Sequence, residues 1–230
     1  MSLQTIIDRA ESINIDTRRV VASTLSRNQK ILTATRNSTQ PWRFKVTPTS
    51  GYRWDRDYYD YTLNAVTPMR RTVAAIEATD RHTSAVINLA RNTGMTWITE
   101  YQGELNSGQR GDMTINSFSG TTLIMNLGST VQSLPSGTIL FEAGDIIQPA
   151  NSAYPYKVQS RVLRGSGTTR TVTTHRPLIP ETGVTVSGQL LDFGIDCDWT
   201  VKIVALPSYT ITPDRFVEWS GDFELIEVVA

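Results

Sequence analysis

The amino-acid sequence predicts a mainly β protein. Short segments rich in branched and aromatic residues recur along the chain, and polar turns separate them. In the second half these segments follow one another at roughly 8–12 residues, with glycines between or beside them, which is typical of a small sandwich or barrel. A chain of 230 residues has room for one large all-β domain or two small ones.

The chain is expected to begin with a short helix. Its apolar residues recur at helical spacing, namely Leu3, Ile6, Ile7 and Ala10. Ser2 is a suitable N-cap residue. We expect the helix to end at Asn14 and Asp16.

Three strands are predicted next, in the segments RRVVAST (18–24), QKILTAT (29–35) and WRFKV (42–46). The last is the clearest strand of the chain, because apolar and basic residues alternate along it: Trp42, Arg43, Phe44, Lys45 and Val46. This alternation predicts a strand with one buried face.

Residues 52–66 are predicted to form a short helix that stops near Thr67-Pro68, because proline disfavours helix in the residue before it. TVAAIEAT (72–79) could be helix or strand by propensity, and a strand is favoured because Asp80-Arg81 interrupts the segment and SAVINLA (84–90) follows it. TWITEY (96–101) is predicted as a strand.

The composition changes at about Glu104, where NSGQRGD (106–112) has the polar, glycine-containing character of a domain junction or a hairpin. Seven segments with strand character follow: MTINSF (113–118), TTLIMNL (121–127), GTILF (137–141), DIIQP (145–149), YPYKVQSRVLR (154–164), TTRTVTTHR (168–176) and VTVSG (184–188). The pattern changes again around Leu191–Asp198. Four more strands are then predicted, in WTVKIVAL (199–206), YTIT (209–212), FVEW (216–219) and DFELIEVV (222–229).

A turn or bulge is predicted at Ala143-Gly144-Asp145, between TILF and DIIQP. Glycine adopts backbone angles there that other residues resist, so the corner lets the chain bend between two strands.

Charge is unevenly distributed, although Lys+Arg and Asp+Glu are equal at 22 each. Residues 1–50 carry eight Lys/Arg against three acids, and residues 195–230 carry seven acids against two bases. The neutral total does not favour nucleic acid as a partner. The opposite charges of the two ends of the chain favour association between molecules.

The sequence contains no recognisable catalytic apparatus, so we expect a protein that is not an enzyme and holds no metal or cofactor. A zinc site needs three or four ligands, and Cys197 is the single thiol beside two distant histidines, His82 and His175. Nucleophilic catalysis by Cys197 with one of these histidines has no local support. Neither a G-x-S-x-G elbow nor a phosphate-binding GxxxxGK[ST] loop occurs.

A soluble protein made in a reducing cytosol is expected, because one cysteine allows no internal disulfide. The N-terminus lacks the basic and apolar regions of a signal peptide. No apolar run approaches the roughly 20 residues that span a bilayer.

Both faces of the terminal segment DFELIEVVA become apolar towards its end. An exposed edge strand of this kind is unusual. Either the strand lies inside the sheet, or another chain covers it. If another chain covers it, the basic start and the acidic finish of the sequence favour head-to-tail assembly of several copies.

The sequence resembles the distal tail and baseplate-hub proteins of long-tailed bacteriophages. The resemblance rests on five segments in order: SRNQKILTATRNSTQPWRFKVTP, WITEYQGE, GTILFEAGDIIQP with YPYKVQSRV, and WSGDFELIEVV. It implies a β-barrel or sandwich "belt" domain that forms a ring, with a small OB-like or galectin-like β-barrel domain inserted. The ring domain would then comprise residues 1–106 and 195–230, and the inserted barrel residues 107–194. The family supplies no catalytic residues.

On this resemblance we expect a structural virion protein, made in the host cytoplasm, at the junction of tail tube and baseplate. Its partners would be its own copies in a six-fold or three-fold ring, tail tube and hub proteins, and DNA only as cargo through the lumen; no membrane is implied. The charge split predicts that bases of one copy face acids of the next, with the candidate interface residues Arg18, Arg19, Arg43, Lys45, Glu218, Asp222, Glu224 and Glu227.

Two other functions stay open. The inserted domain could bind carbohydrate or a host surface, with Tyr154 and Tyr156 stacking on sugars. It could also be an OB-like binder of single-stranded nucleic acid, and aromatic and basic residues interleave elsewhere, at 42–45 and 52–56. Strand alternation explains the first of these runs without nucleic acid.

Overall fold

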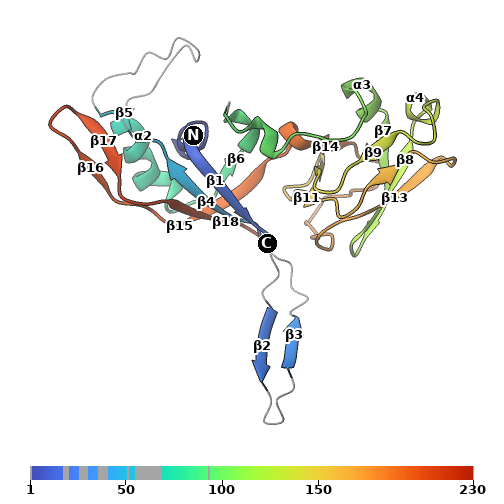
Figure 1. Ribbon diagram of the computed structural model, residues 1–230, viewed down its shortest axis with the longest axis horizontal. Helices are drawn as coiled ribbons and strands as arrows, with labels where there is room; N and C mark the ends of the chain where they lie inside the picture. The colour runs from blue at the N-terminus through green and yellow to red at the C-terminus, as the bar shows by residue number, and fades with distance from the viewer. Residues whose placement is uncertain are drawn as a thin grey trace.

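The computed structural model describes residues 2–17, 21–25, 31–35, 41–50, 52–54, 69–92 and 94–229. Its buried apolar side chains fall into two clusters. One is built from residues between 3 and 89 and between 197 and 225, together with Ile146. The other is built from residues between 105 and 193. We call the parts of the chain around these clusters the sheet unit and the inserted unit; they lie side by side in Figure 1.

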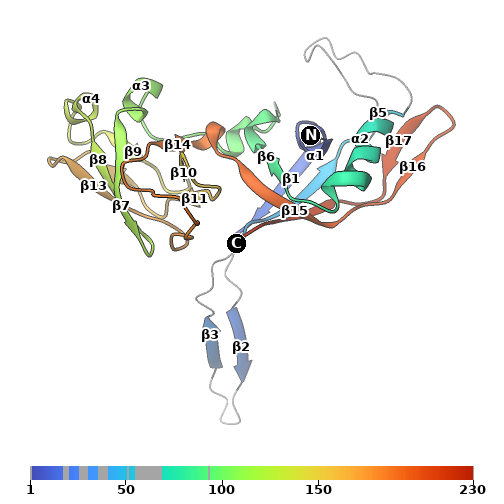
Figure 2. The same cartoon turned by 180° about the vertical axis from the view of Figure 1, so that it is seen from behind.

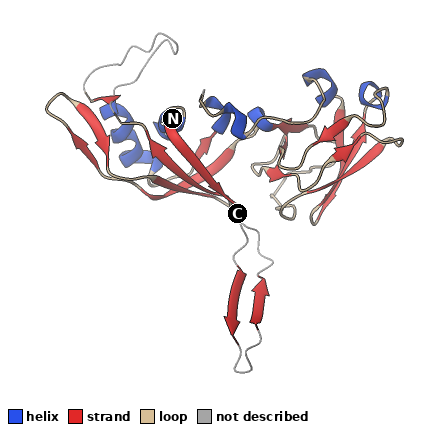
Figure 3. Cartoon of the chain, viewed as in Figure 1, coloured by secondary structure: helices blue, strands red, loops and turns tan. Residues whose placement is uncertain are grey.

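The sheet unit is organised around one five-stranded antiparallel sheet, in the order β1-β4-β18-β15-β6. Its strands are β1 (Ala10–Asp16), β4 (Arg43–Pro48), β6 (Ala85–Ile87), β15 (Trp199–Ala205) and β18 (Phe223–Glu227). Two short helices, α1 (Ser2–Ile7) and α2 (Met69–Ala75), lie on the same side of this sheet in Figures 1 and 3.

Two smaller β elements extend from this sheet. A three-stranded ribbon contains β16 (Tyr209–Ile211), β17 (Phe216–Trp219) and β5 (Tyr52–Arg53). A hairpin of β2 (Val21–Leu25) and β3 (Ile31–Thr35) occurs between β1 and β4 in the chain. In the views of Figures 1 and 2 this hairpin stands away from both units.

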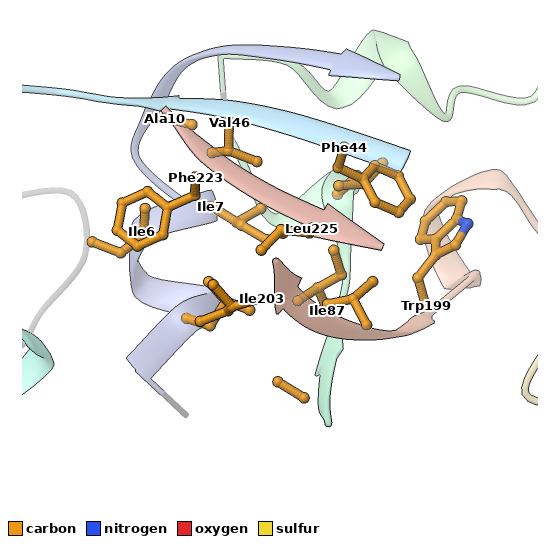
Figure 4. Close-up of a cluster of buried hydrophobic side chains, with 14 of the residues drawn as sticks. Ile6, Ile7, Ala10, Phe44, Val46, Ile87, Trp199, Ile203, Phe223 and Leu225 are labelled. Carbon is orange, nitrogen blue, oxygen red and sulfur yellow. The ribbon is translucent and has the colours of Figure 1, made fainter. Parts of the chain in front are cut away.

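Alternation along the strands gives the sheet one buried face. The buried side chains on this face are Phe44, Phe223, Leu225, Trp199 and Ile203, and Figure 4 shows them in one cluster with Ile6 and Ile7 of α1. The residues between them in the chain are exposed or half-buried and form the opposite face. The predicted alternation at 42–46 is therefore confirmed.

The inserted unit contains three small antiparallel sheets, in the orders β13-β8-β7, β12-β9 and β11-β10-β14. Their strands are β7 (Met113–Ser119), β8 (Thr122–Leu127), β9 (Ile139–Phe141), β10 (Ile146–Pro149), β11 (Tyr156–Lys157), β12 (Val162–Leu163), β13 (Thr169–Thr173) and β14 (Leu191–Phe193). Two short helices, α3 (Ser107–Arg110) and α4 (Ser129–Gln132), accompany them. The mainly β class is confirmed, but no sheet closes into a barrel within the described residues.

The segment 72–79 was predicted as a strand, and this is wrong. Helix α2 continues into a π-helical turn, Ile76–Asp80. Met69, Val73 and Ile76 are buried, at the spacing of one helical face. The run of alanines and β-branched residues has no marked preference by itself, and packing against α1 decides the outcome.

The strand predicted at 96–101 is also wrong. Residues Thr96–Ile98 form a 3₁₀ turn, and Trp97 is 67% exposed. A strand needs a neighbouring strand for its backbone hydrogen bonds, and the amides here instead bond within the segment, as Ile98 does to the Met95 carbonyl (3.0 Å).

Three further expectations change in detail. Residues 10–16 form β1 rather than the end of a helix, because they pair with β4. Residues 184–188, predicted as a strand, have no regular structure up to 186 and form a turn at 187–188. The helix predicted at 52–66 begins instead with β5, and residues 55–66 lie outside the described part.

The terminal strand β18 lies between β4 and β15. Its two apolar faces therefore fit a central position in the sheet, and no second chain is required to cover its edges. The predicted corner at residues 143–145 is confirmed, with Gly144 at φ 105° in the region that favours glycine.

Neighbouring residues of β15 provide a test of the sheet's orientation. Replacing the buried Ile203 by alanine is expected to lower the free energy of unfolding by about 2–5 kcal/mol, because the change leaves a cavity. Val204→Ala, at a side chain 63% exposed, is expected to change it by no more than about 0.5 kcal/mol. Urea unfolding of dilute protein measures both values, and equal effects would contradict the assignment of the faces.

Candidate functional site

A buried ion pair joins the inserted unit to the sheet unit. Arg176, which follows β13, donates from Nη2 to Oε1 of Glu227 on β18 at 2.7 Å and from Nη1 to Oε2 of the same carboxylate. The two side chains are 2% and 0% exposed. Arg176 Nη2 also donates to the Pro155 carbonyl (2.7 Å), and its guanidinium lies over the Tyr156 ring at 5.3 Å.

Glu227 is held from the sheet side as well. The Trp42 backbone N–H donates to Glu227 Oε2 (3.0 Å), and the Glu227 N–H donates to the Trp42 carbonyl (2.8 Å). The carboxylate is therefore fixed by both units. A buried charge is tolerated when it is paired and hydrogen-bonded in this way, and removing one partner leaves the other uncompensated.

The glycine corner contributes a second connection. Asp145 is buried and accepts two backbone hydrogen bonds at 2.8 Å, one from Glu142 and one from Gln102 in the segment that leads into the inserted unit. Burial raises the pKa of the Asp145 carboxyl. The sequence predicted a turn here but gave no sign that its aspartate ties down the linking segment.

Two side-chain contacts complete the junction. Gln148 on β10 accepts from the Asp198 backbone N–H through Oε1 (2.9 Å), and Lys157 Nζ on β11 donates to Thr17 Oγ1 (3.1 Å). Polar contacts thus connect the units at several places, with Arg176–Glu227 the most deeply buried.

The sheet face opposite the helices is the candidate interaction surface, and we call it the outer face. It carries a groove of about 370 Å³. The residues that line the groove come from β1, β4, β15 and β18: Asn14, Asp16, Arg43, Phe44, Lys45, Val204, Glu224, Leu225 and Ile226. The outer face therefore combines charged side chains with exposed aliphatic ones.

Some of these charges are already paired inside the chain. Lys45 Nζ lies 3.0 Å from Asp222 Oδ2, and this hydrogen bond is the main cause that raises the Lys45 pKa. Hydrogen bonds from Thr47 and then Lys45 lower the pKa of the Asp222 carboxyl. Glu224 sits directly opposite Lys45 in the pairing of β18 with β4.

Arg43 differs from Lys45. It is exposed, lies opposite Ile226 on β18, and makes no ion pair with an acid in the described ranges. Lys202 on β15, on the other side of Ile226, is likewise exposed and without such a partner.

Among the candidate interface residues, Glu227 requires a correction, because its carboxylate is buried against Arg176 and cannot reach a neighbouring molecule in this fold. Lys45 and Asp222 meet within one chain. Arg18 and Arg19 lie outside the described residues. Arg43, Glu218 and Glu224 are exposed.

Glu218 belongs to a second exposed region, at the tip of the β16–β17 ribbon. Phe216 and Glu218 alternate with the buried Val217 and share the solvent-facing side of β17. Phe216 is 37% exposed, and the Arg53 guanidinium lies over its ring at 5.7 Å. Asp214, in the turn before β17, is exposed.

The thiol has the features of a core residue. Cys197 is buried, burial raises its pKa well above the usual value, and its Sγ faces the carbonyls of Ile146 and Asp192. On either side of the buried thiol, Asp196 is exposed and Asp198 is half-buried. In the described ranges no three His, Cys, Asp or Glu side chains gather as metal ligands would.

The aromatic residues considered as binding platforms are mostly inside. Tyr154 and Tyr156 are buried, so they cannot stack on a sugar at the surface. Trp42 and Phe44 point into the core, and Trp54 stacks on Tyr209 at 5.6 Å. None of the helices within the described residues has the length and apolar character to cross a membrane.

No family model matches the chain, and no curated protein matches it in sequence.

The buried ion pair can be tested on one strand. Glu227→Gln is expected to lower the free energy of unfolding by about 3–5 kcal/mol, because Arg176 then stays buried without a counter-charge. Glu224→Gln, the exposed neighbour on β18, is the matched control and is expected to cost no more than about 0.5 kcal/mol. Urea unfolding compares the two.

A double variant separates the charge from the packing. Arg176→Met combined with Glu227→Leu removes both charges, so it is expected to be more stable than Glu227→Gln alone. Equal losses for Glu227→Gln and Glu224→Gln would mean that the pair does not hold the units together.

Proposed function

We propose that the protein is a structural component of a bacteriophage tail that forms a ring at the junction of tail tube and baseplate. In this proposal the sheet unit is the ring-forming domain. The inserted unit is the small barrel-like domain outside the ring, where it anchors hub or receptor-binding components. The protein works by assembly, with its own copies and the neighbouring tail proteins as partners.

The observation that carries the proposal is the outer face. Helices cover one side of the five-stranded sheet, and none of the described elements covers the other (Figures 1 and 3). Val204, 63% exposed, and the half-buried Ile226 lie there beside Arg43, which makes no ion pair with a described residue. Exposed apolar side chains ringed by polar ones are typical of a surface that another protein covers.

Chain order supports the same function. The sheet is built from both ends of the sequence, with the inserted unit between them. This is the order implied by the resemblance of the sequence to distal tail and baseplate-hub proteins. The buried ion pair between the units also suits a structural protein, because a contact made by one unit then sets the position of the other unit.

The proposal is tested by the mass and shape of the purified full chain. Light scattering over a range of concentrations is expected to give three or six times the chain mass of 25.6 kDa, and negative-stain images are expected to show an annulus with a central hole. A mass of one chain at every concentration would contradict the proposal.

A further inference from the structure

The outer face and the tip of the β16–β17 ribbon are complementary in chemistry. The outer face presents Val204 and Ile226 beside Arg43 and Lys202, two cations that make no ion pair within the described part of the chain. Two acids share this face, Asp16 opposite Arg43 on β1 and Glu224 opposite Lys45 on β18. Ile226 is flanked by Arg43 and Lys202, so at this point of the face an apolar side chain lies next to positive charge. A surface that fits this one needs an exposed apolar group next to negative charge.

The ribbon tip has these properties. Phe216 and Glu218 stand two residues apart on the solvent-facing side of β17, so an aromatic ring and a carboxylate project together. Asp214 adds a second exposed carboxylate nearby in the chain, and the exposed Arg215 stands between it and Phe216 in the sequence. Arg53, the arginine paired with Phe216 across the ribbon, lies over that ring. Glu218 itself makes no ion pair within the described residues.

One chain cannot join its own two surfaces. The tip of β16 and β17 lies at the end of the molecule farthest from the inserted unit in Figures 1 and 2. Arg43 lies in the five-stranded sheet, at the end of β4 that pairs with Ile226. The complementary pair must therefore meet between two molecules.

Packing two outer faces against each other is less favourable. It would bring Arg43 and Lys202 of one molecule toward the same two cations of the other, and like charges that face each other across an interface disfavour the complex. Contact between unlike surfaces is head-to-tail, and such contacts close into rings when the rotation allows.

We propose that the β16–β17 tip of one copy docks on the outer face of the next copy, with Glu218 against Arg43 and Phe216 against Val204 and Ile226. This inference rests on the proposed function and names the contact that would close the ring. It reduces the predicted charge pairing to Arg43 and Glu218. Glu224 is also exposed and makes no ion pair within the described residues, but it lies on the same sheet face as Arg43, so Glu218 is the acid of that set that a neighbouring copy can bring to Arg43.

The contact is tested by charge reversal in the full chain. Arg43→Glu and Glu218→Arg are each expected to weaken self-association by about tenfold or more at low salt, and the double variant is expected to regain part of the loss. The matched controls are Arg81→Glu and Glu100→Arg, which reverse exposed charges outside both surfaces. Phe216→Ala is expected to weaken self-association at any salt concentration.

A covalent readout places the two residues. Mixing Arg43→Cys with Glu218→Cys protein under mild oxidation is expected to yield a disulfide-linked dimer, whereas Arg81→Cys with Glu218→Cys is expected to yield none. The native thiol is buried and does not compete. Circular dichroism confirms that each variant is folded.

The outcomes separate the two proposals. If the native protein forms a ring that neither charge reversal weakens, and the cysteine pair does not cross-link, the contact is wrong and the proposed function stands. If the native protein is one chain at every concentration, both proposals are wrong. Restoration in the double variant together with the cross-link supports the contact.

Discussion

The buried pair of Arg176 and Glu227 is the interaction on which the arrangement of this molecule depends. The inserted unit has its own apolar cluster, so its internal packing does not require a particular position relative to the sheet. The ion pair fixes that position, because two charged side chains that are 2% and 0% exposed are tolerated only when they are paired with each other. Trp42, which directly precedes β4, connects the ion pair to that strand. Its backbone N–H donates to the Glu227 carboxylate, and its carbonyl accepts from the Glu227 backbone N–H.

The same strand links the joint to the candidate interaction surface. On β18, Phe223, Leu225 and Glu227 face inward, and Glu224 and Ile226 face outward. One side of the strand thus contributes to the apolar core and to the buried ion pair, while the other side contributes to the groove of the outer face. Ile226, which lines the groove of the outer face, is therefore the direct neighbour in the chain of Glu227, whose carboxylate orients the inserted unit. This proximity suits a part that must set one partner's position relative to another.

Local patterns predicted those features that depend on neighbours in the chain. Alternation placed Trp42 and Phe44 inside and Arg43 outside, and the glycine corner at 144 was visible as a turn. The two apolar faces of the terminal segment indicated a strand that needed cover on both sides, and β4 with β15 provide neighbours on both edges. The helix over 69–75 was missed because β-branched residues and alanine leave the type open until α1 packs on it.

The ion pair between the two units could not be predicted in the same way. Arg176 and Glu227 are 51 positions apart, and each stands in a segment with ordinary strand character. Nothing in a charge count marks a carboxylate as buried, and for that reason Glu227 was assigned to an interface between copies. Asp145 is a similar case, since its two backbone partners are set by the path of the chain around residue 102 rather than by the turn itself.

We expect the two units to be held in one orientation, so that the outer face and the inserted unit act together. Spin labels on Arg81→Cys in the sheet unit and Thr171→Cys in the inserted unit, both exposed positions, measure this directly, because the buried native thiol takes no label. In labelled protein diluted with unlabelled chain, pulsed electron paramagnetic resonance is expected to give one narrow distance. A broad or multiple distribution in the native protein would contradict a fixed orientation of the two units.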